Sequence, residues 1–267
     1  MKRILVLGAT GDQGHPLLTR LIAAGMTPVA ALRNPKALAG TEFADVETVA
    51  ADIYDEASMI AATRGMDAIA AHLPFVFDRA LAQKMGASIA AAGRANGIKR
   101  IVFHTSCHIA DEDIGSPAMD GRRDIIAAIS GSGCEWAIIE SRVFMDNMIR
   151  SWNKPSIVNS GIFAYPAKPD LKISWICLDD VAAFMVEALA NPDLPSGRYR
   201  VGGPEALVGD EVAAILSKVS GKVSGELWHS AVLSLGLAAL AVASYIWLRF
   251  EWQFGIGALF SLVHDVV

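Results

Sequence analysis

The chain has no excess of positive charge and few cysteines, and each shortage excludes a class of protein. There are 23 Lys and Arg against 28 Asp and Glu in 267 residues, a formal net charge of −5. A nucleic-acid-binding protein needs a basic surface stripe, so we expect no nucleic-acid partner. The three cysteines, Cys107, Cys134 and Cys177, lie far apart and form no Cys-x-x-Cys pair. This spacing predicts no metal site and suits a reducing compartment.

The N-terminus leaves no room for a cleavable signal peptide. Met1-Lys2-Arg3 is followed directly by an apolar strand pattern and a glycine-rich turn. A secretory leader would need an apolar stretch of about 7–15 residues that ends in small residues. We therefore expect the N-terminal part of the chain to be cytoplasmic.

Three glycines spaced three apart follow the first apolar run, Ile4–Leu7. A turn without side chains, between a buried strand and a helix N-terminus, lets backbone N–H groups approach a pyrophosphate. The helical pattern that follows ends at Gly25, a typical C-cap. The turn therefore predicts a dinucleotide site, and a glycine-rich turn that binds nothing is the alternative. The expected phosphate-loop residues are Gly8, Thr10, Gly11, Asp12, Gln13 and Gly14.

Short apolar runs alternate with helical patterns as far as Lys222, which predicts an α/β fold with a doubly wound parallel sheet. The expected strands are Arg3–Leu7, Pro28–Leu32, Val46–Ala50, Ala68–Ala71, Arg100–Phe103 and Trp136–Ile139. The clearest helices are expected at Arg79–Asn96, Asp124–Ser130, Leu178–Leu189 and Val208–Val219. We assign residues 1–150 to a dinucleotide-binding domain and 151–222 to substrate-lobe elements and closing helices.

A long uncharged run, Leu227–Leu248, contains no Asp, Glu, Lys or Arg. At a rise of about 1.5 Å per residue, a helix of this length crosses a hydrocarbon core of about 30 Å. Trp228 lies near one end and Trp247 near the other, where interfacial aromatic residues belong. We expect a C-terminal apolar helix of the membrane type and membrane association through residues 227–263. A buried helix of a soluble core is the alternative.

A series of segments in order along the chain carries a family resemblance. They are Val6–Gly14, Ala31–Pro35, Ala51–Asp55, Ile101–Ser106, Phe144–Asn147, Asp179–Ala182 and Val201–Leu207. Together they resemble the NmrA-like family of atypical short-chain dehydrogenases/reductases, over residues 1 to about 222. The resemblance implies a Rossmann-like fold that binds a nicotinamide cofactor. It also implies that the small substrate lobe is truncated here.

The last residues resemble a different protein. Val223–Leu227, Tyr245–Gln253 and His264–Val266 are similar to the SecF subunit of the bacterial protein-export machinery. The resemblance implies a transmembrane fragment over residues 223–267. We expect the chain to join two truncated sequences near Ser220–Lys222, with no export activity. A role as a membrane component of protein export is an alternative that depends on this tail alone.

Arg33 ends the second expected strand, where a site that prefers NAD places an acid to hold the ribose 2′-OH. A guanidinium suits the 2′-phosphate of NADPH instead, so we expect NADP(H) to be preferred over NAD(H). A solvated arginine in a turn before Pro35 is the alternative.

The next two strand ends supply further candidates for cofactor binding. The family resemblance implies that Asp52 contacts the adenine amino group, and Ile53 follows it directly. A cap for the helix around Glu56–Thr63 is the alternative role of Asp52. Leu73 and Pro74 are expected to line the nicotinamide side of the cleft, although a plain loop would look the same.

Candidates for catalysis are fewer. A typical short-chain dehydrogenase uses a tyrosine with a lysine four residues later, and no tyrosine of this chain has one. The family's usual lysine region holds Asp120–Asp124, whose arginines cannot act as a base. Glu140-Ser141 stands where relatives commonly have Arg-Pro. His104 and Ser106, at the end of the fifth strand, remain as catalytic candidates, with loop and capping roles as the alternative.

We expect an NADPH-dependent reductase of a small carbonyl or quinone-like compound, so the expected partner is a small-molecule substrate. Phe144, Asn147 and Trp175 are expected to shape the substrate pocket. The alternative is a non-catalytic NADP redox sensor that acts on a regulatory protein partner. The missing Tyr/Lys pair favours the sensor, and the apolar cleft favours the enzyme.

Overall fold

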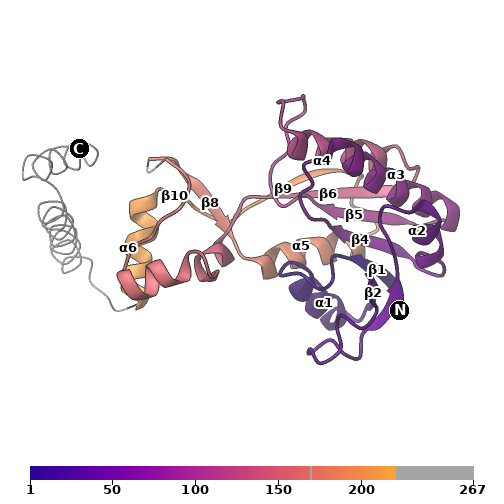
Figure 1. Cartoon of the computed structure of the whole chain (residues 1–267), viewed down its shortest axis with the longest axis horizontal. Helices are drawn as coiled ribbons and strands as arrows, with labels where there is room; N and C mark the ends of the chain where they lie inside the picture. Colours follow the sequence, from indigo (N-terminus) through magenta and orange to yellow (C-terminus); the bar gives the residue numbers. More distant parts are fainter. Residues whose placement is uncertain (169, 221–267) are drawn as a thin grey trace, which may run out of the picture. The chain divides into compact units, whose positions relative to one another are not determined.

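The computed structural model describes residues 1–168 and 170–220. It divides into two compact units, which are described separately. The first comprises Met1–Asn147 and Lys172–Leu207, and the described residues of the second are 148–168, 170–171 and 208–220. The labels of the helices and strands are those of Figure 1.

The first unit is built on a parallel sheet with the strand order β3-β2-β1-β4-β5-β6-β9. Its strands are β1 (Arg3–Leu7), β2 (Thr27–Leu32), β3 (Glu47–Ala50), β4 (Ala68–His72), β5 (Arg100–His104), β6 (Glu135–Ser141) and β9 (Gly197–Val201). All neighbouring strands in this sheet run parallel. The chain winds outward first on one side of β1 and then on the other, so the predicted doubly wound α/β fold is confirmed. Ligands of such sheets bind at the carboxyl ends of the strands, where the winding reverses.

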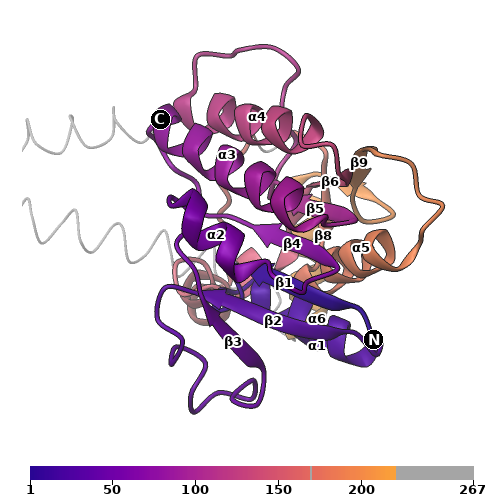
Figure 2. The ribbon, with the colours of Figure 1, turned by 90° about the vertical axis from the view of Figure 1, so that its right-hand side faces the viewer.

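Helices cover both faces of this sheet (Figures 1 and 2). On one face α1 (Gly14–Ala23) packs beside α5 (Leu178–Ala190). On the other lie α2 (Glu56–Ala62), α3 (Arg79–Asn96) and α4 (Pro117–Ser130). Side chains of β1 alternate between the two cores, because successive residues of a strand point to opposite faces. Ile4 and Val6 belong to the first core, and Leu5 and Leu7 to the second.

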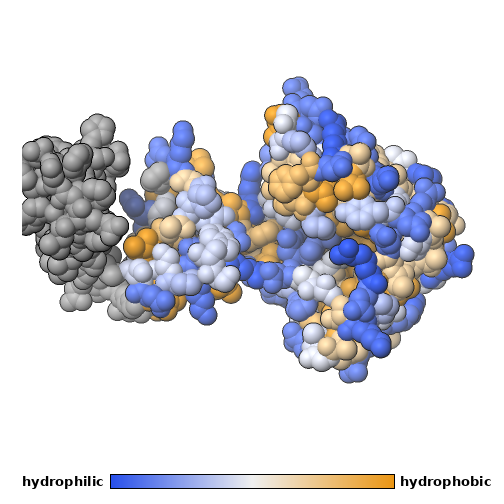
Figure 3. Space-filling model, in the orientation of Figure 1, coloured by the Kyte–Doolittle hydropathy of each residue, from blue (hydrophilic) through white to orange (hydrophobic). Residues whose placement is uncertain are grey.

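Hydrophilic and hydrophobic residues are mixed on the face of the molecule shown in Figure 3. The sequence prediction for α3 has the observed bounds, but α4 begins at Pro117, seven residues before the predicted start at Asp124. Its first turns pack through small residues and carry no apolar stripe. A Cβ at Gly121 would lie only 2.7 Å from the Cβ of Ala82 on α3.

Four short strands were not predicted. One is β9, at the edge of the main sheet. The others form a separate sheet in the order β10-β8-β7, made of β7 (Val143–Phe144), β8 (Ile173–Ile176) and β10 (Ala206–Leu207). These strands are short and pair with partners distant in sequence, which leaves no local pattern for prediction.

The described part of the second unit contains helical turns and loops but no strand. A 3₁₀ turn (Met145–Ile149) leads into it, and it contains a single π-helical turn (Ser156–Ser160) and α6 (Gly209–Ser220). Tyr165 lies between two aromatic rings, with ring centroids 6.1 Å from Trp152 and 6.2 Å from Phe163.

Within residues 1–168 and 170–220, no helix is long and apolar enough to cross a membrane. The run Leu227–Leu248, for which a membrane-type helix is expected, lies outside these residues, as does the whole SecF-like segment 223–267.

Arg100 ties the start of β5 to the far end of α5. Its side chain is buried, and Nη1 donates to the carbonyl oxygen of Ala188, 2.8 Å away. Nη2 donates to the carbonyl oxygen of Leu194 at 2.8 Å and to Glu135 Oε2 at 2.7 Å. One guanidinium thus satisfies carbonyl groups at the end of a helix, where intrahelical partners are missing.

We expect Arg100→Met to lower the free energy of unfolding by about 2–4 kcal/mol, because it leaves buried carbonyl groups without donors. Urea denaturation measures the change. Arg3→Met is the matched control, since Arg3 pairs with Glu47 at the exposed surface. That pair should contribute less than about 1 kcal/mol. Equal losses in the two variants would contradict the role given to Arg100.

Candidate functional site

The turn from β1 into α1 has no space for side chains at two of its glycines. Gly8 has a φ of +82°, and a Cβ there would lie 2.4 Å from the carbonyl oxygen of His72. A Cβ at Gly14 would lie 2.2 Å from the carbonyl oxygen of Gly8. The helix starts after Gln13, whose side chain makes no capping hydrogen bond. An uncapped helix N-terminus beside a bare turn suits a phosphate group.

A cavity of about 280 Å³ opens beside this turn, over the carboxyl ends of β1 to β4. Six of the predicted cofactor-binding residues line it: Gly8, Thr10, Arg33, Ile53, Leu73 and Pro74. The other five, Gly11, Asp12, Gln13, Gly14 and Asp52, do not border it. Tyr54 and His72 also line it, and sequence reasoning did not identify them. The sequence did carry a signal for His72, because it is a polar residue at the end of an apolar strand, β4.

Arg33 lies exposed at the end of β2, on the wall of this cavity. Among the residues that line the cavity there is no aspartate or glutamate. A negative group would therefore meet a permanent cation here and no opposing carboxylate.

Asp52 does not cap α2, so the alternative interpretation of this residue is wrong. Its Oδ1 accepts a hydrogen bond from the backbone N–H of Tyr54 at 3.0 Å, in a local turn. The cap is Asp55, whose Oδ1 accepts from the N–H of Ala57 at 2.9 Å. Asp52 itself is exposed.

Ser106 is held against the glycine turn in an unusual backbone conformation. Its φ is +64°, a left-handed value that side chains with a Cβ seldom adopt. Its hydroxyl donates to Gln13 Oε1 at 3.1 Å, so two of the predicted site residues meet. Strained conformations of this kind cost of order 1 kcal/mol or more and concentrate at functional sites.

His104 and His72 lie side by side on β5 and β4, paired in register. His104 is 1% exposed, and its Nε2 shares a hydrogen bond of 2.9 Å with Ser141 Oγ. Burial, with the nearby Arg122 charge, lowers the pKa of His72 to about 4. Burial, with His72 and Arg122, lowers the pKa of His104 to about 3. Both imidazoles are therefore neutral at physiological pH, and His104 holds no imidazolium proton to deliver there.

Of the expected substrate residues, Phe144 lies near the catalytic candidates, with its ring centroid 5.8 Å from that of His104. Trp175 is buried on β8, paired with Val143 of β7. Asn147 lies in the 3₁₀ turn that follows β7. None of the three borders the cavity beside the glycine turn.

Glu140 is part of an ion network beside these residues. Its side chain is fully buried, and its carboxylate accepts from Arg198 Nε at 2.6 Å. The same carboxylate lies 2.7 Å from His108 Nδ1. Because the Glu140 carboxylate is paired with these two side chains, an acid can be accommodated at this buried position.

The sequence pattern of the NmrA-like family matches residues 1–226, and that of the C-terminal part of the protein export membrane proteins SecD and SecF matches residues 206–267. An NAD(P)H azoreductase of Xenophilus azovorans is 31% identical over 221 residues, which are 82% of this chain and 74% of that protein. The protein translocase subunit SecF of Cereibacter sphaeroides is 52% identical over 52 residues, 20% of this chain but only 16% of that protein. The resemblance to both families is confirmed.

Among solved structures, an NADPH-dependent quinone oxidoreductase of Escherichia coli in complex with NADPH superimposes with a TM-score of 0.69. It is 24% identical in sequence, and the match covers 82% of this chain and 76% of that one. At this identity the likeness shows the fold alone.

The neutral histidines predict a pH dependence of stability. An unfolded histidine titrates near 6.5, so between pH 6.5 and about 4 the unfolded state binds a proton that folded His72 does not. The free energy of unfolding is therefore highest above pH 6.5 and falls as the pH drops towards 4. We expect His72→Gln to flatten this fall by up to about 1.4 kcal/mol per pH unit.

Urea denaturation at a series of pH values measures this slope. His15→Gln is the control, because His15 packs against Phe43, outside this pair. A wild-type slope that His72→Gln leaves unchanged would show that His72 titrates normally.

Proposed function

The chain belongs to the NmrA-like family over residues 1–226, and from this premise we propose that it is an NADPH-dependent reductase of a small carbonyl or quinone-like compound. One observation carries the proposal. The cavity beside the glycine turn is lined by Arg33 and by no carboxylate.

The residues of the site fit such a cofactor. The bare turn at Gly8 and the uncapped start of α1 would hold the pyrophosphate. Arg33 would hold the 2′-phosphate, because a guanidinium offers several N–H donors to a dianion. Leu73 and Pro74 would line the side of the cavity nearer the reacting ring. When bound, the cofactor supplies a hydride for transfer to the substrate.

The chain's own groups near the reacting ring would then position the substrate and exclude water. Ser106 is the donor we assign to a substrate oxygen: its hydroxyl, which donates to Gln13 Oε1 in this structure, would turn to the substrate, and its backbone is held in a strained turn. Neutral His104 would hold Ser141 in place through their shared hydrogen bond. Phe144 packs beside His104 and would supply an apolar wall.

We expect the chain to bind NADPH at least about ten-fold more tightly than NADH, and Arg33→Ala to remove most of this preference. A hydrogen bond to a charged group contributes about 1.5–3 kcal/mol, which corresponds to about ten-fold or more in affinity. Calorimetric titration of both cofactors measures it. Lys36→Ala, three residues further along the same turn, is the matched control and should keep the preference. Equal wild-type affinities for the two cofactors would remove Arg33 from the site.

We also expect slow NADPH oxidation with quinone acceptors that does not depend on a tyrosine. Tyr54 lines the cavity without a lysine partner, so Tyr54→Phe should leave kcat unchanged within about two-fold. Ser106→Ala should lower kcat by at least about ten-fold, because it removes a donor to the substrate oxygen. Spectrophotometric assays of the variants decide between these roles. Loss of turnover in Tyr54→Phe would overturn the assignment.

These assays also separate the enzyme from the regulatory alternative. An enzyme binds NADPH and oxidises it with an acceptor. A sensor binds NADPH at the same cavity with no turnover with any quinone or aldehyde, and then Ser106→Ala would change nothing.

A further inference from the structure

Three side chains at the carboxyl edge of the sheet hold buried nitrogen atoms without hydrogen-bond partners. Both ring nitrogens of His72, Nδ1 of His104, and Nε and Nη1 of Arg122 make no hydrogen bond within the described part of the chain. The three residues come from β4, β5 and α4; the charge of Arg122 lowers the pKa of both histidines, and His72 also lowers the pKa of His104. Buried polar atoms are normally paired, so five unpaired nitrogens in one place need an explanation.

Arg122 is the most unusual member, because it is a cation that is only 2% exposed and forms no ion pair with a carboxylate of residues 1–168 or 170–220. Its Nη2 donates to the carbonyl oxygen of Leu73 at 2.7 Å, and its guanidinium carbon lies 3.8 Å from the centre of the Phe75 ring. Burial lowers its pKa to about 10, which still leaves it charged at neutral pH. An unpaired buried charge is costly, and folding alone gives no reason to keep one.

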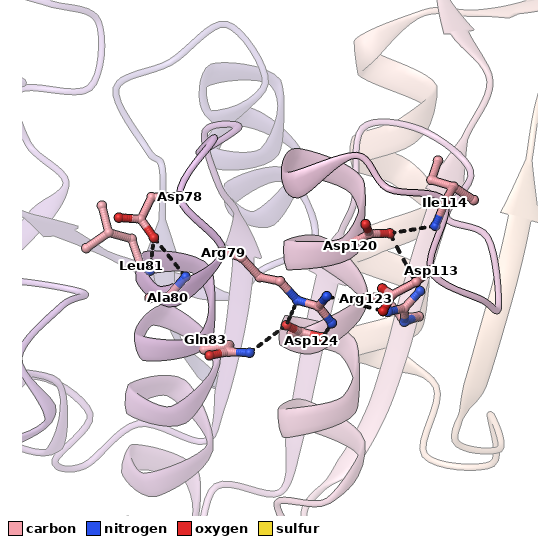
Figure 4. A network of polar contacts seen from close by, with 10 residues as sticks. All are labelled: Asp78, Arg79, Ala80, Leu81, Gln83, Asp113, Ile114, Asp120, Arg123 and Asp124. Carbon is pink, nitrogen blue, oxygen red and sulfur yellow. Dashed lines mark hydrogen bonds and ion pairs between the residues drawn. The ribbon is translucent and has the colours of Figure 1, made fainter.

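Three acids on or near α4, Asp113, Asp120 and Asp124, already have partners other than Arg122 (Figure 4). Asp124 accepts from Arg79 Nε at 2.6 Å and also from Gln83. Asp113 pairs with Arg79 and with Arg123. Asp120 accepts from the backbone N–H of Ile114 at 3.0 Å and lies 3.7 Å from Arg123 Nη1. These carboxylates are thus paired with Arg79 and Arg123, whereas the charge of Arg122 acts on the two imidazoles.

The cluster adjoins the cofactor cavity. His72 and Leu73 both line that cavity, and Leu73 is also the residue that accepts the Arg122 hydrogen bond. Phe75, which covers the guanidinium, is 40% exposed on the loop between β4 and α3. A partly exposed side chain on a loop can move aside. A planar ligand would then stack on the Arg122 guanidinium as the Phe75 ring does.

We propose that Arg122, flanked by His72 and His104, binds an anionic oxygen of the substrate, so that the preferred substrates are planar compounds carrying a phenolate, enolate or carboxylate. The inference rests on the proposed reductase function, since it places the substrate beside the cofactor cavity. Guanidinium N–H groups can only donate, and a neutral imidazole offers one donor, so the cluster matches a ligand that is rich in acceptors.

The test compares 2-hydroxy-1,4-naphthoquinone, which is an anion at neutral pH, with its uncharged parent 1,4-naphthoquinone. Both are titrated calorimetrically into the full chain, with and without saturating NADP⁺, which prevents turnover. The wild-type chain should bind the anion at least about ten-fold more tightly than the parent. Arg122→Met should abolish this preference, and Arg122→Lys should keep part of it. Arg123→Met, the neighbouring arginine engaged by Asp113, should keep it fully.

Thermal unfolding supplies a second readout that a purely structural arginine would not give. Arg122→Met removes an unpaired buried charge but also the donor to the carbonyl oxygen of Leu73, and because these effects oppose each other its midpoint should stay close to that of the wild-type chain. A lowered midpoint together with a retained preference for the anion would overturn the proposal, as would equal wild-type affinities for the two probes. Failure of the wild-type chain to bind NADP⁺ would instead overturn the proposed function, and the titrations without NADP⁺ would still test Arg122.

Discussion

The close approach of the first turn to the end of β4 is the constraint on which the site depends. The carbonyl oxygen of His72 occupies the space that a side chain at Gly8 would need, and the carbonyl oxygen of Gly8 occupies that of Gly14. Because the backbone can pass this closely only without Cβ atoms, α1 starts directly above the sheet. Its uncapped end and the cavity beside it follow from this path.

Most of the main sheet was predictable from the sequence, because buried parallel strands read as short apolar runs between helical patterns. The helix Arg79–Asn96 has the predicted bounds, since Asp78 caps it and Gly97 ends it in a left-handed conformation. Prediction failed where the pattern is not local. The first half of α4 packs through small residues such as Gly121, and the two residues of β7 are fixed by pairing with β8.

In the candidate site, too, some residues were predictable from the local sequence and others were not. Gly8 and Arg33 carry their signal in the sequence, because a turn and a strand end are defined by neighbouring residues. Arg122 carries no such signal, since its importance comes from the absence of hydrogen-bond partners for its buried Nε and Nη1, which the sequence does not show. An arginine in a helix with three other charged residues, Asp120, Arg123 and Asp124, is typical of a surface position. Only the three-dimensional arrangement shows that Arg123 faces the acids and Arg122 faces the interior.

Arg122 and Arg123 are adjacent on α4 but have different roles. Arg123, with Arg79 of α3, joins the outer surface of the two helices through Asp113 and supports the fold. Arg122 places an unpaired charge against two imidazoles whose burial keeps them neutral, which opposes folding. A network of outer ion pairs that stabilises α4 can therefore offset the cost of holding Arg122 inside. Stability and ligand recognition are then assigned to opposite faces of the same helix, and a substitution on one face need not disturb the other.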